Sequence, residues 1–179
     1  MRVLLSADEI QSSIRVLAKE ISRREAKKPL TVIAVMTGSI IFLADLIRQL
    51  DMPLRVGVIQ ARSYAGTDRG ALSVNSDMLP ELAGKDVLVV DDIFDTGHTL
   101  VEVLARLRAA GPRSIRSAVL VLKQGKQQVA LRPDYVGFQI PDVFVVGYGL
   151  DYNGAFRNLP YLAALEPPDI EDQSPTGGT

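Results

Sequence analysis

Three carboxylates stand close together in residues 87–100, the most informative stretch of the chain. Asp91 and Asp92 end a run of aliphatic residues, and Asp95 opens a short polar loop that leads into an amphipathic segment. A strand, a polar loop and a helix N-terminus in this order are typical of phosphate sites in α/β folds, because several backbone N–H groups can point at one anion. Carboxylates beside that anion suit a ribose diol or Mg²⁺. The stretch therefore predicts a site for a phosphorylated ribose.

The polar loop after these carboxylates carries several donors for an anion. Gly97 has no Cβ atom, so the backbone can approach a phosphate closely. Thr96 and Thr99 add hydroxyl donors on either side of it. His98 is the only histidine of the chain, and we expect its backbone N–H to join the phosphate site while its ring faces solvent.

Each of the three carboxylates also has a plainer interpretation. Asp91 and Asp92 would then mark a strand end that reaches solvent, and Asp95 would cap a helix N-terminus. Two adjacent carboxylates repel each other, and at the buried edge of a sheet this repulsion costs free energy unless a ligand or cation offsets it. Because a phosphate-type loop follows directly, the pattern favours a binding site.

Strands and helices alternate along the chain, and this order determines where the carboxylates must lie. Apolar runs predict strands over residues 30–36, 55–60, 86–92 and 114–123, with short candidates at 135–138 and 144–147. Helical spacing predicts helices over residues 7–27, 40–50 and 97–110, and polarity predicts a long loop over residues 61–77. We therefore predict an α/β fold with right-handed crossovers around a mainly parallel sheet, and ligands beyond the carboxyl ends of its strands.

Length and composition are those of one globular domain. The chain has 179 residues, of which 47% are hydrophobic and 23% are charged. We predict a single domain over residues 1–165 and a disordered, proline-containing tail over residues 166–179. With 20 basic and 21 acidic residues the formal net charge is −1, so the composition gives no basic surface for nucleic acid.

Cysteine content and hydropathy bear on the cellular compartment. The chain contains no cysteine, which excludes disulfides, thiolate nucleophiles and Cys-ligated zinc and fits a reducing compartment. No stretch is long and apolar enough for a membrane span, and the N-terminus lacks the apolar run of a signal peptide. We therefore expect a soluble, cytoplasmic protein that binds neither nucleic acid nor membrane.

Residues 87–100 resemble the 5-phosphoribosyl-1-pyrophosphate (PRPP) signature of the type I phosphoribosyltransferases. An Asp at the position of Asp95 resembles the branch of that family that acts on 6-oxopurines, and implies that this residue handles the proton on purine N7 as a general base. The resemblance implies that Asp91 and Asp92 bind the ribose hydroxyls of PRPP. It also implies that the loop 95–99 binds the phosphate. Many 6-oxopurine members carry Glu where this chain has the shorter Asp91.

Residues 36–39 stand where this family places its pyrophosphate loop, directly after the first strand of the sheet. The resemblance implies that the backbone of Thr37 and Gly38 and the hydroxyl of Ser39 bind pyrophosphate. Thr37 departs from the family pattern, because the oxopurine salvage enzymes usually carry Lys or Arg at this position. A helix N-cap at Thr37 or Ser39 is the plainer alternative.

Ser63 and Tyr64 open the long polar loop and resemble the Ser-Tyr pair of the family's flexible lid. The resemblance implies a mobile loop that closes over the reacting centre and excludes water, which would otherwise capture an oxocarbenium-like state. The alternative is a surface tyrosine on a loop without a role in the chemistry.

The C-terminal part of the chain resembles the purine-binding block of the hypoxanthine-guanine phosphoribosyltransferases. The resemblance implies that Phe144 stacks on the purine and that Val145 offers backbone contacts to its edge. It implies that Lys123 donates to the exocyclic oxygen, which selects 6-oxo over 6-amino rings because an ammonium only donates. Asp151 would lie at the purine and hold Mg²⁺, and Arg157 would meet pyrophosphate. The alternative for Lys123 is a strand that emerges into solvent.

Together these resemblances imply a purine-salvage enzyme that uses Mg²⁺, with Asp91, Asp92 and Asp151 as metal ligands. It would transfer the 5-phosphoribosyl group from PRPP to N9 of hypoxanthine, and of guanine, giving IMP or GMP and pyrophosphate. The alternatives are a xanthine-preferring enzyme, a PRPP-sensing regulator that binds nucleic acid, and a generic nucleotide-binding module. The family fold adds a small hood built from the terminal segments, and its dimers and tetramers imply a homo-oligomer.

Overall fold

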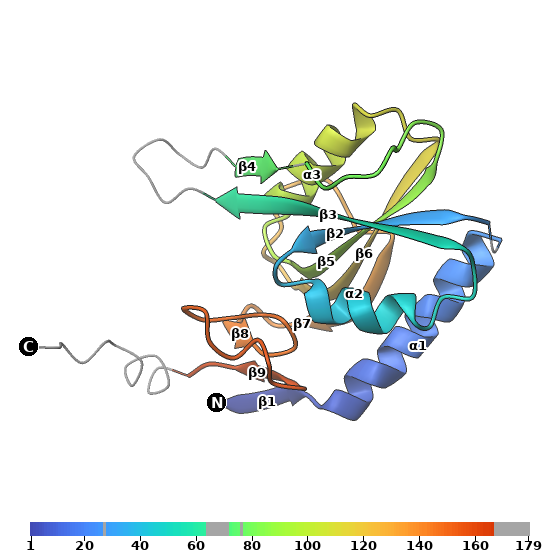
Figure 1. Cartoon of the computed structure of the whole chain (residues 1–179). Helices are drawn as coiled ribbons and strands as arrows, with labels where there is room; N and C mark the ends of the chain where they lie inside the picture. The colour runs from blue at the N-terminus through green and yellow to red at the C-terminus, as the bar shows by residue number, and fades with distance from the viewer. Residues whose placement is uncertain (27, 64–71, 76, 167–179) are drawn as a thin grey trace, which may run out of the picture.

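The fold is centred on a six-stranded sheet with the strand order β4-β3-β2-β5-β6-β7 (Figure 1). The computed structural model describes residues 1–26, 28–63, 72–75 and 77–166. All neighbouring strands are parallel except β4, which pairs with β3 in antiparallel fashion. This confirms the predicted α/β fold with a mainly parallel sheet. The strands are β2 (Leu30–Met36), β3 (Leu54–Ser63), β4 (Leu72–Asn75), β5 (Asp86–Phe94), β6 (Ser114–Lys123) and β7 (Tyr135–Ile140).

Helices cover both faces of this sheet. α1 (Ala7–Arg24) and α2 (Ile40–Ile47) lie on one face, and α3 (His98–Arg108) lies on the other (Figure 1). Successive side chains of a strand point to opposite faces, and β2, whose only polar residue is Thr31, therefore contributes to two cores. Val32 and Ala34 pack in the cluster with α1 and α2, whereas Ile33 and Val35 pack in the cluster with α3. The central strands are therefore buried on both sides.

The strand order reverses next to β2. The chain passes from β2 through α2 to β3 on one side, whereas β5 lies on the other side and leads through α3 to β6. In open α/β sheets, ligands bind at such a reversal, outside the carboxyl ends of the strands. Here the loop after Met36 and the strand end at Asp91 and Asp92 meet at that point.

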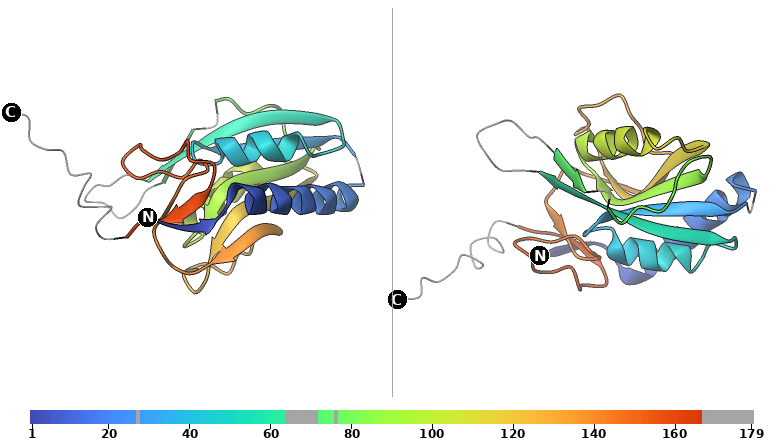
Figure 2. Two further views of the ribbon diagram at one scale, coloured as in Figure 1. Left: turned by 90° about the horizontal axis from the view of Figure 1, so that it is seen from below. Right: turned by 45° about the horizontal axis from the view of Figure 1, so that its top comes forward.

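A second, smaller sheet forms a hood over the carboxyl ends of the strands. It consists of β1 (Arg2–Leu5), β9 (Leu162–Ala164) and β8 (Val145–Val146), paired in antiparallel fashion in the order β1-β9-β8. Figure 2 shows this sheet beside the N-terminal end of α1. The hood therefore joins the two ends of the described chain, as the family resemblance implied.

A buried tyrosine anchors the hood to the helices. Tyr148 follows β8, and its hydroxyl donates a hydrogen bond to the carboxylate of Asp45 on α2. Gln11 on α1 donates to the same carboxylate at 2.5 Å. Burial and the neighbouring carboxylate both raise the pKa of Tyr148, so the phenol stays protonated and keeps donating. One side chain of the hood thus contacts both helices of one sheet face.

Several boundaries differ from the predictions. α1 ends at Arg24 rather than at residue 27, because Ala26 adopts a left-handed conformation (φ 50°). β5 and β7 each run two residues further than predicted, to Phe94 and Ile140. The predicted strand over residues 144–147 shrinks to β8, since Gly147 has φ 96°.

The predicted loop over residues 61–77 is wrong in part. β3 continues to Ser63, and β4 returns antiparallel to it over Leu72–Asn75. Polar composition suggested a loop, but an edge hairpin tolerates polar residues because one of its faces is solvated. Tyr64 of the predicted lid lies outside the described residues, and so does the predicted tail except for its first residue. The lid and the single domain over residues 1–165 stay predictions. No described helix has the length and hydropathy to cross a membrane.

Candidate active site

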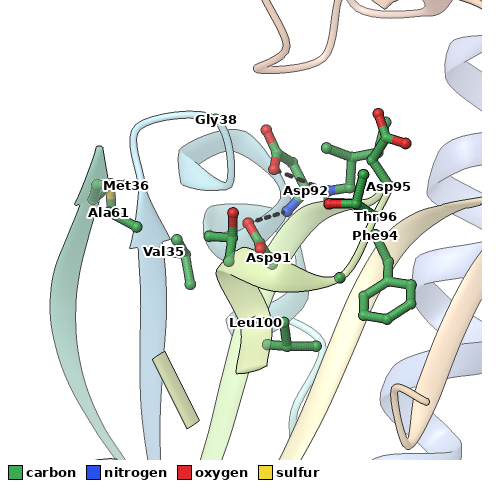
Figure 3. A pocket seen from close by; sticks show the side chains of 13 residues that line it. Val35, Met36, Gly38, Ala61, Asp91, Asp92, Phe94, Asp95, Thr96 and Leu100 are labelled. Carbon is green, nitrogen blue, oxygen red and sulfur yellow. Dashed lines mark hydrogen bonds between the residues drawn. The ribbon is translucent and has the colours of Figure 1, made fainter. Parts of the chain in front are cut away.

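A cavity of about 210 Å³ opens at the carboxyl ends of β2 and β5 (Figure 3). Its walls come from the two strand ends, the loop before α3 and the first turn of that helix. Most of the predicted phosphate and ribose site is therefore gathered in one place. The residues that line it are Val35, Met36, Gly38, Ala61, Asp91, Asp92, Ile93, Phe94, Asp95, Thr96, Gly97, Thr99 and Leu100.

Asp91 and Asp92 are buried neighbours at the floor of this cavity, 6% and 8% exposed. The Asp92 N–H donates to Asp91 Oδ1 at 3.0 Å, and the Ile93 N–H donates to Asp92 Oδ1 at 2.9 Å. Burial raises the pKa of both carboxyls, and the adjacent Asp92 charge raises the pKa of Asp91 further. The charge of Arg157 opposes this rise at Asp92. Two carboxylates held like this favour a hydroxylated or cationic ligand.

Asp91→Asn is expected to stabilise the ligand-free protein at pH 8 by about 1–3 kcal/mol, since it removes a buried charge. The folded-state pKa of Asp91 is raised, so the folded protein holds more protons than the unfolded chain above about pH 4. Wild-type stability therefore falls as pH rises through this window, whereas the amide is unaffected. Urea unfolding without ligand measures the free energy of unfolding of both proteins at pH 5 and at pH 8. We expect the advantage of Asp91→Asn over the wild type to be larger at pH 8.

Asp86→Asn on the same strand is the matched control with the opposite sign. A hydrogen bond from Arg113 lowers the pKa of Asp86 to about 2, so its charge stabilises the fold above about pH 4 and this contribution is lost as pH falls toward 2. Because Arg113 is largely exposed, the amide is expected to destabilise by only about 0.5–1 kcal/mol at neutral pH. Equal destabilisation by both substitutions would contradict the burial argument for Asp91.

Asp95 stands at the rim of the cavity with its two oxygens in different surroundings. Asp95 Oδ2 accepts a hydrogen bond from Lys123 Nζ at 3.1 Å. Asp95 Oδ1 is buried and has no hydrogen-bond partner among the described residues. A buried carboxylate oxygen without a donor is costly, and it marks the place where a ligand N–H fits. The plainer interpretation, that Asp95 caps the following helix, is wrong, because the N-cap residue of α3 is Gly97.

The phosphate loop is supported from behind by residues 124–129. Gly97 has φ 93°, and a Cβ there would lie 2.4 Å from Val129 Cγ2. The backbone N–H of Gln128 donates to Thr96 O at 2.9 Å. His98 is exposed, and its Nε2 lies 3.1 Å from Gln128 Oε1. The loop is therefore fixed by its neighbours, with the His98 ring outside the cavity lining.

The pyrophosphate loop approaches Asp92 closely. A Cβ on Gly38 would lie 1.6 Å from Asp92 Oδ2, so any side chain at this position would displace the Asp92 carboxylate. Thr37 is exposed beside it. The prediction that the Ser39 hydroxyl binds pyrophosphate is wrong, because this side chain is fully buried and donates to Val35 O at 2.6 Å. Ser39 is the N-cap residue of α2, as the alternative interpretation predicted, although its side chain makes no capping hydrogen bond.

Arg157 and Asp151 lie together in the loop between β8 and β9. Their side chains form an ion pair at 2.6 Å. Asp151 Oδ2 also accepts from the Gly154 N–H at 2.8 Å, and an Arg157 N–H donates to Gly149 O at 2.6 Å. A Cβ on Gly149 would lie 2.1 Å from Gly38 O. This loop is therefore held against the pyrophosphate loop, although neither charged residue lines the cavity.

Lys123 is buried at the end of β6, 8% exposed, which excludes the alternative of a strand emerging into solvent. Phe144 is 48% exposed and packs edge-on against Tyr152, with ring centroids 5.5 Å apart. Val145 is buried behind it. An exposed aromatic face is suited to stacking on a planar heterocycle, and a buried ammonium is suited to binding an acceptor on it.

The structure brings together only part of the predicted site. Of the predicted residues, the cavity lining includes Gly38, Asp91, Asp92, Asp95, Thr96, Gly97 and Thr99. The predicted residues that do not line it are Thr37, His98, Lys123, Phe144, Val145, Asp151 and Arg157. Sequence reasoning missed Asp142, which lies 3.6 Å from Lys123 Nζ. The sequence did contain a signal for this residue, because Asp142 lies two positions before Phe144, which was predicted to stack on the purine.

Comparison with known proteins identifies the family. Residues 4–153 match the phosphoribosyl transferase domain. The chain is 38% identical over 169 residues to the bifunctional protein TilS/HprT of Listeria innocua, covering 93% of this chain but 26% of that protein. It thus spans about a quarter of the length of those bifunctional relatives. It is 35% identical to the hypoxanthine-guanine phosphoribosyltransferase of Staphylococcus aureus, covering 92% of this chain and 93% of that protein.

Solved structures agree with the sequence comparison. A hypoxanthine-guanine phosphoribosyltransferase from Bacillus anthracis, with a HEPES molecule in its active site, superposes with a TM-score of 0.88 at 36% identity. The match covers 93% of this chain and 99% of that chain. The carboxylate pair, the phosphate loop and the buried lysine thus stand in a fold that these relatives share. The chain therefore belongs to the phosphoribosyltransferase family and, within it, to the hypoxanthine-guanine phosphoribosyltransferases.

Proposed function

We propose that this chain transfers the 5-phosphoribosyl group from PRPP to N9 of hypoxanthine, and of guanine, giving IMP or GMP and pyrophosphate. The observation that carries the proposal is the pair formed by Asp95 and Lys123 at the rim of the cavity. An ammonium donates only, so Lys123 suits the carbonyl at C6 of a 6-oxopurine. The free, buried oxygen of Asp95 suits the N–H at N7 of the same ring.

The 5-phosphate of PRPP is assigned to the loop before α3. Backbone N–H groups at the helix N-terminus and the hydroxyls of Thr96 and Thr99 are donors beside the cavity. The ribose hydroxyls are assigned to Asp91 and Asp92, whose repulsion a hydroxylated ligand offsets. In this assignment, C1′ of the ribose lies between the phosphate loop and the purine.

Pyrophosphate is assigned to the opposite wall of the cavity. The backbone of Thr37 and Gly38 follows directly after β2 at this wall. Arg157 donates to the carbonyl of Gly149, and Gly149 lies directly against Gly38. Thr37 brings no charge where related salvage enzymes usually carry a cation. In this chain the positive charge for the leaving group thus rests on Arg157 and on the metal.

The reaction in this geometry exchanges one bond for another at C1′. The lone pair of purine N9 forms the new bond, and pyrophosphate departs with the electron pair of the broken C–O bond. Positive charge develops on the purine, and the N7 proton passes to Asp95. Phe144 stacks on the ring and Val145 contacts its edge through the backbone. Positioning and electrostatic stabilisation then account for most of the rate.

Mg²⁺ is the metal that we propose for this site. Asp91 and Asp92 present buried carboxylate oxygens, the donors that Mg²⁺ prefers. Asp151, the third predicted ligand, lies in the hood loop and does not line the cavity. Within the described parts of the chain, no three His, Cys, Asp or Glu side chains converge on one point. This fits an ion that takes one or two carboxylates and completes its shell with phosphate oxygens and water. When bound, it neutralises charge on the pyrophosphate.

We also propose a homo-oligomer in the cytoplasm, with PRPP and a 6-oxopurine as small-molecule substrates. Apolar side chains are exposed on both helices of one sheet face, with Val16 67%, Ile40 44% and Ile41 37% exposed. Exposed apolar side chains on two helices of one face support an interface with a second copy of the chain. The absence of cysteine over all 179 residues fits a reducing compartment.

The proposed function is tested by steady-state turnover with PRPP and Mg²⁺ against hypoxanthine, guanine, xanthine, adenine and uracil. We expect activity with the 6-oxopurines only, and loss of that activity when EDTA removes the metal. Excess Mg²⁺ added back is the control for the chelator. Turnover of adenine at a comparable rate would contradict the role of Lys123, and PRPP binding without turnover of any base would contradict the enzymatic assignment.

A further inference from the structure

We infer that Asp142 is a positioning residue for base recognition, holding the Lys123 ammonium toward the exocyclic oxygen of a 6-oxopurine. The inference rests on the proposed function, in which Lys123 donates to that oxygen. Asp142 contacts the Lys123 ammonium, and the proposed function assigns no role to this contact. Asp142 acts through Lys123 and has no direct contact with the base.

The contacts around Lys123 show why the ammonium needs protein partners. Its side chain is only 10% exposed, so water satisfies little of its charge. Asp95 Oδ2 lies 3.1 Å from Nζ on one side, and Asp142 Oδ1 lies 3.6 Å from Nζ on the other. Asp142 Oδ2 in turn accepts from Lys126 Nζ at 2.8 Å. Lys123 thus donates one hydrogen bond to Asp95 and forms a longer ion pair with Asp142, so an N–H of the ammonium remains for a ligand.

The two carboxylates are not equivalent during the reaction. Asp95 receives the N7 proton, and once protonated it is neutral and no longer an ion-pair partner for Lys123. Asp142 then provides the only other charge within 4 Å of the ammonium among the described residues. The hydrogen bond from Lys126 holds the pKa of Asp142 below its usual range, so this carboxylate stays ionised at neutral pH. Asp142 therefore fixes Lys123 at the stage when Asp95 does not.

The sheet register places Asp142 for this task. β6 and β7 are parallel, with Lys123 opposite Ile140, and the Gln124 N–H donates to Ile140 O at 2.8 Å. Asp142 follows that paired residue by two positions and precedes Phe144 by two. Its distance to Lys123 is thus set by backbone pairing, and the same segment carries the purine stack.

The test compares two nucleotides that differ at the exocyclic oxygen. Affinity for IMP and for purine riboside 5′-monophosphate, which lacks that oxygen, is measured by isothermal titration calorimetry for the wild type and for Asp142→Asn. The amide keeps the size of the side chain but not its charge. We expect IMP to bind about tenfold more weakly to the variant, the size of one charge-assisted hydrogen bond. Affinity for the nucleotide without the oxygen is expected to stay the same.

Lys126→Met is the matched control variant. It removes the outer contact of Asp142, an exposed ion pair of the kind that contributes little. We expect IMP affinity within about twofold of the wild type, because the contact between Asp142 and Lys123 remains. Thermal unfolding of both variants checks that each is folded at the temperature of the titration.

Two results would overturn the inference while leaving the proposed function intact. Unchanged IMP affinity in Asp142→Asn would show that Lys123 needs no second carboxylate. Equal weakening of both nucleotides would show that Asp142 acts on the segment carrying Phe144 rather than on Lys123. If the wild-type chain binds neither nucleotide, the proposed function itself is wrong and the inference falls with it.

Discussion

Asp95→Asn is expected to lower kcat with hypoxanthine by about 10²–10⁴-fold, the usual contribution of one general base. Lys123 Nζ donates to Asp95 Oδ2, so in the variant the amide oxygen takes that position. The amide N–H₂ then faces the site of the buried Oδ1. A donor would meet the N–H of purine N7, and the proton would have no acceptor.

Affinity for PRPP should change little in this variant, because the loop contributes backbone donors that the substitution leaves in place. Single-turnover rates with saturating PRPP separate the chemical step from binding. Glu102→Gln is a matched control, because it also converts a carboxylate to an amide, at an exposed position on the helix that follows the Asp95 loop. A kcat for Asp95→Asn within tenfold of the control would show that Asp95 is not the proton acceptor.

The sequence predicted those site residues that lie close to one another along the chain. Asp91, Asp92 and the loop to Thr99 lie within nine consecutive residues, so a strand followed by a loop and a helix was enough to place them together. The alternation of strands and helices predicted a mainly parallel sheet with right-handed crossovers, and the structure adds the strand order with its reversal beside β2. These features depend on short segments whose preferences agree with the fold.

The features that could not be predicted depend on contacts between distant residues. The family resemblance implied a hood but not its strands: β1 and β9 are four and three residues long, and they pair with each other across the whole chain, with β8 on the other side of β9. The ion pair of Lys123 with Asp142 follows from the register of β6 against β7. The Ser39 hydroxyl was assigned to pyrophosphate because its sequence position is right, but its side chain turns back to Val35. Sequence position does not determine which way a side chain points.

Gly149 is the clearest of these distant contacts, and Gly149→Ala has the second large effect that we expect. The residue has φ 99°, and its added Cβ would lie 2.1 Å from Gly38 O, a backbone atom that cannot rotate away. Its own carbonyl accepts from Arg157 at 2.6 Å. The methyl group must push the hood loop away from the pyrophosphate loop, and Arg157 moves with it. A displacement of about 1 Å in such a loop costs on the order of 10²-fold in kcat/KM.

Gly154→Ala in the same loop separates this close approach from backbone strain. Gly154 also has a left-handed backbone, φ 82°, but a Cβ there meets nothing within 4 Å. Both substitutions carry the strain of a non-glycine residue at positive φ, about 1–3 kcal/mol in the free energy of unfolding. Only Gly149→Ala adds the collision with Gly38. Urea unfolding should therefore show a loss of stability in both variants, with a larger loss in Gly149→Ala. The value of kcat/KM for PRPP should fall in Gly149→Ala alone. Equal kcat/KM in the two variants would mean that the hood loop can move away from Gly38 without disturbing the site.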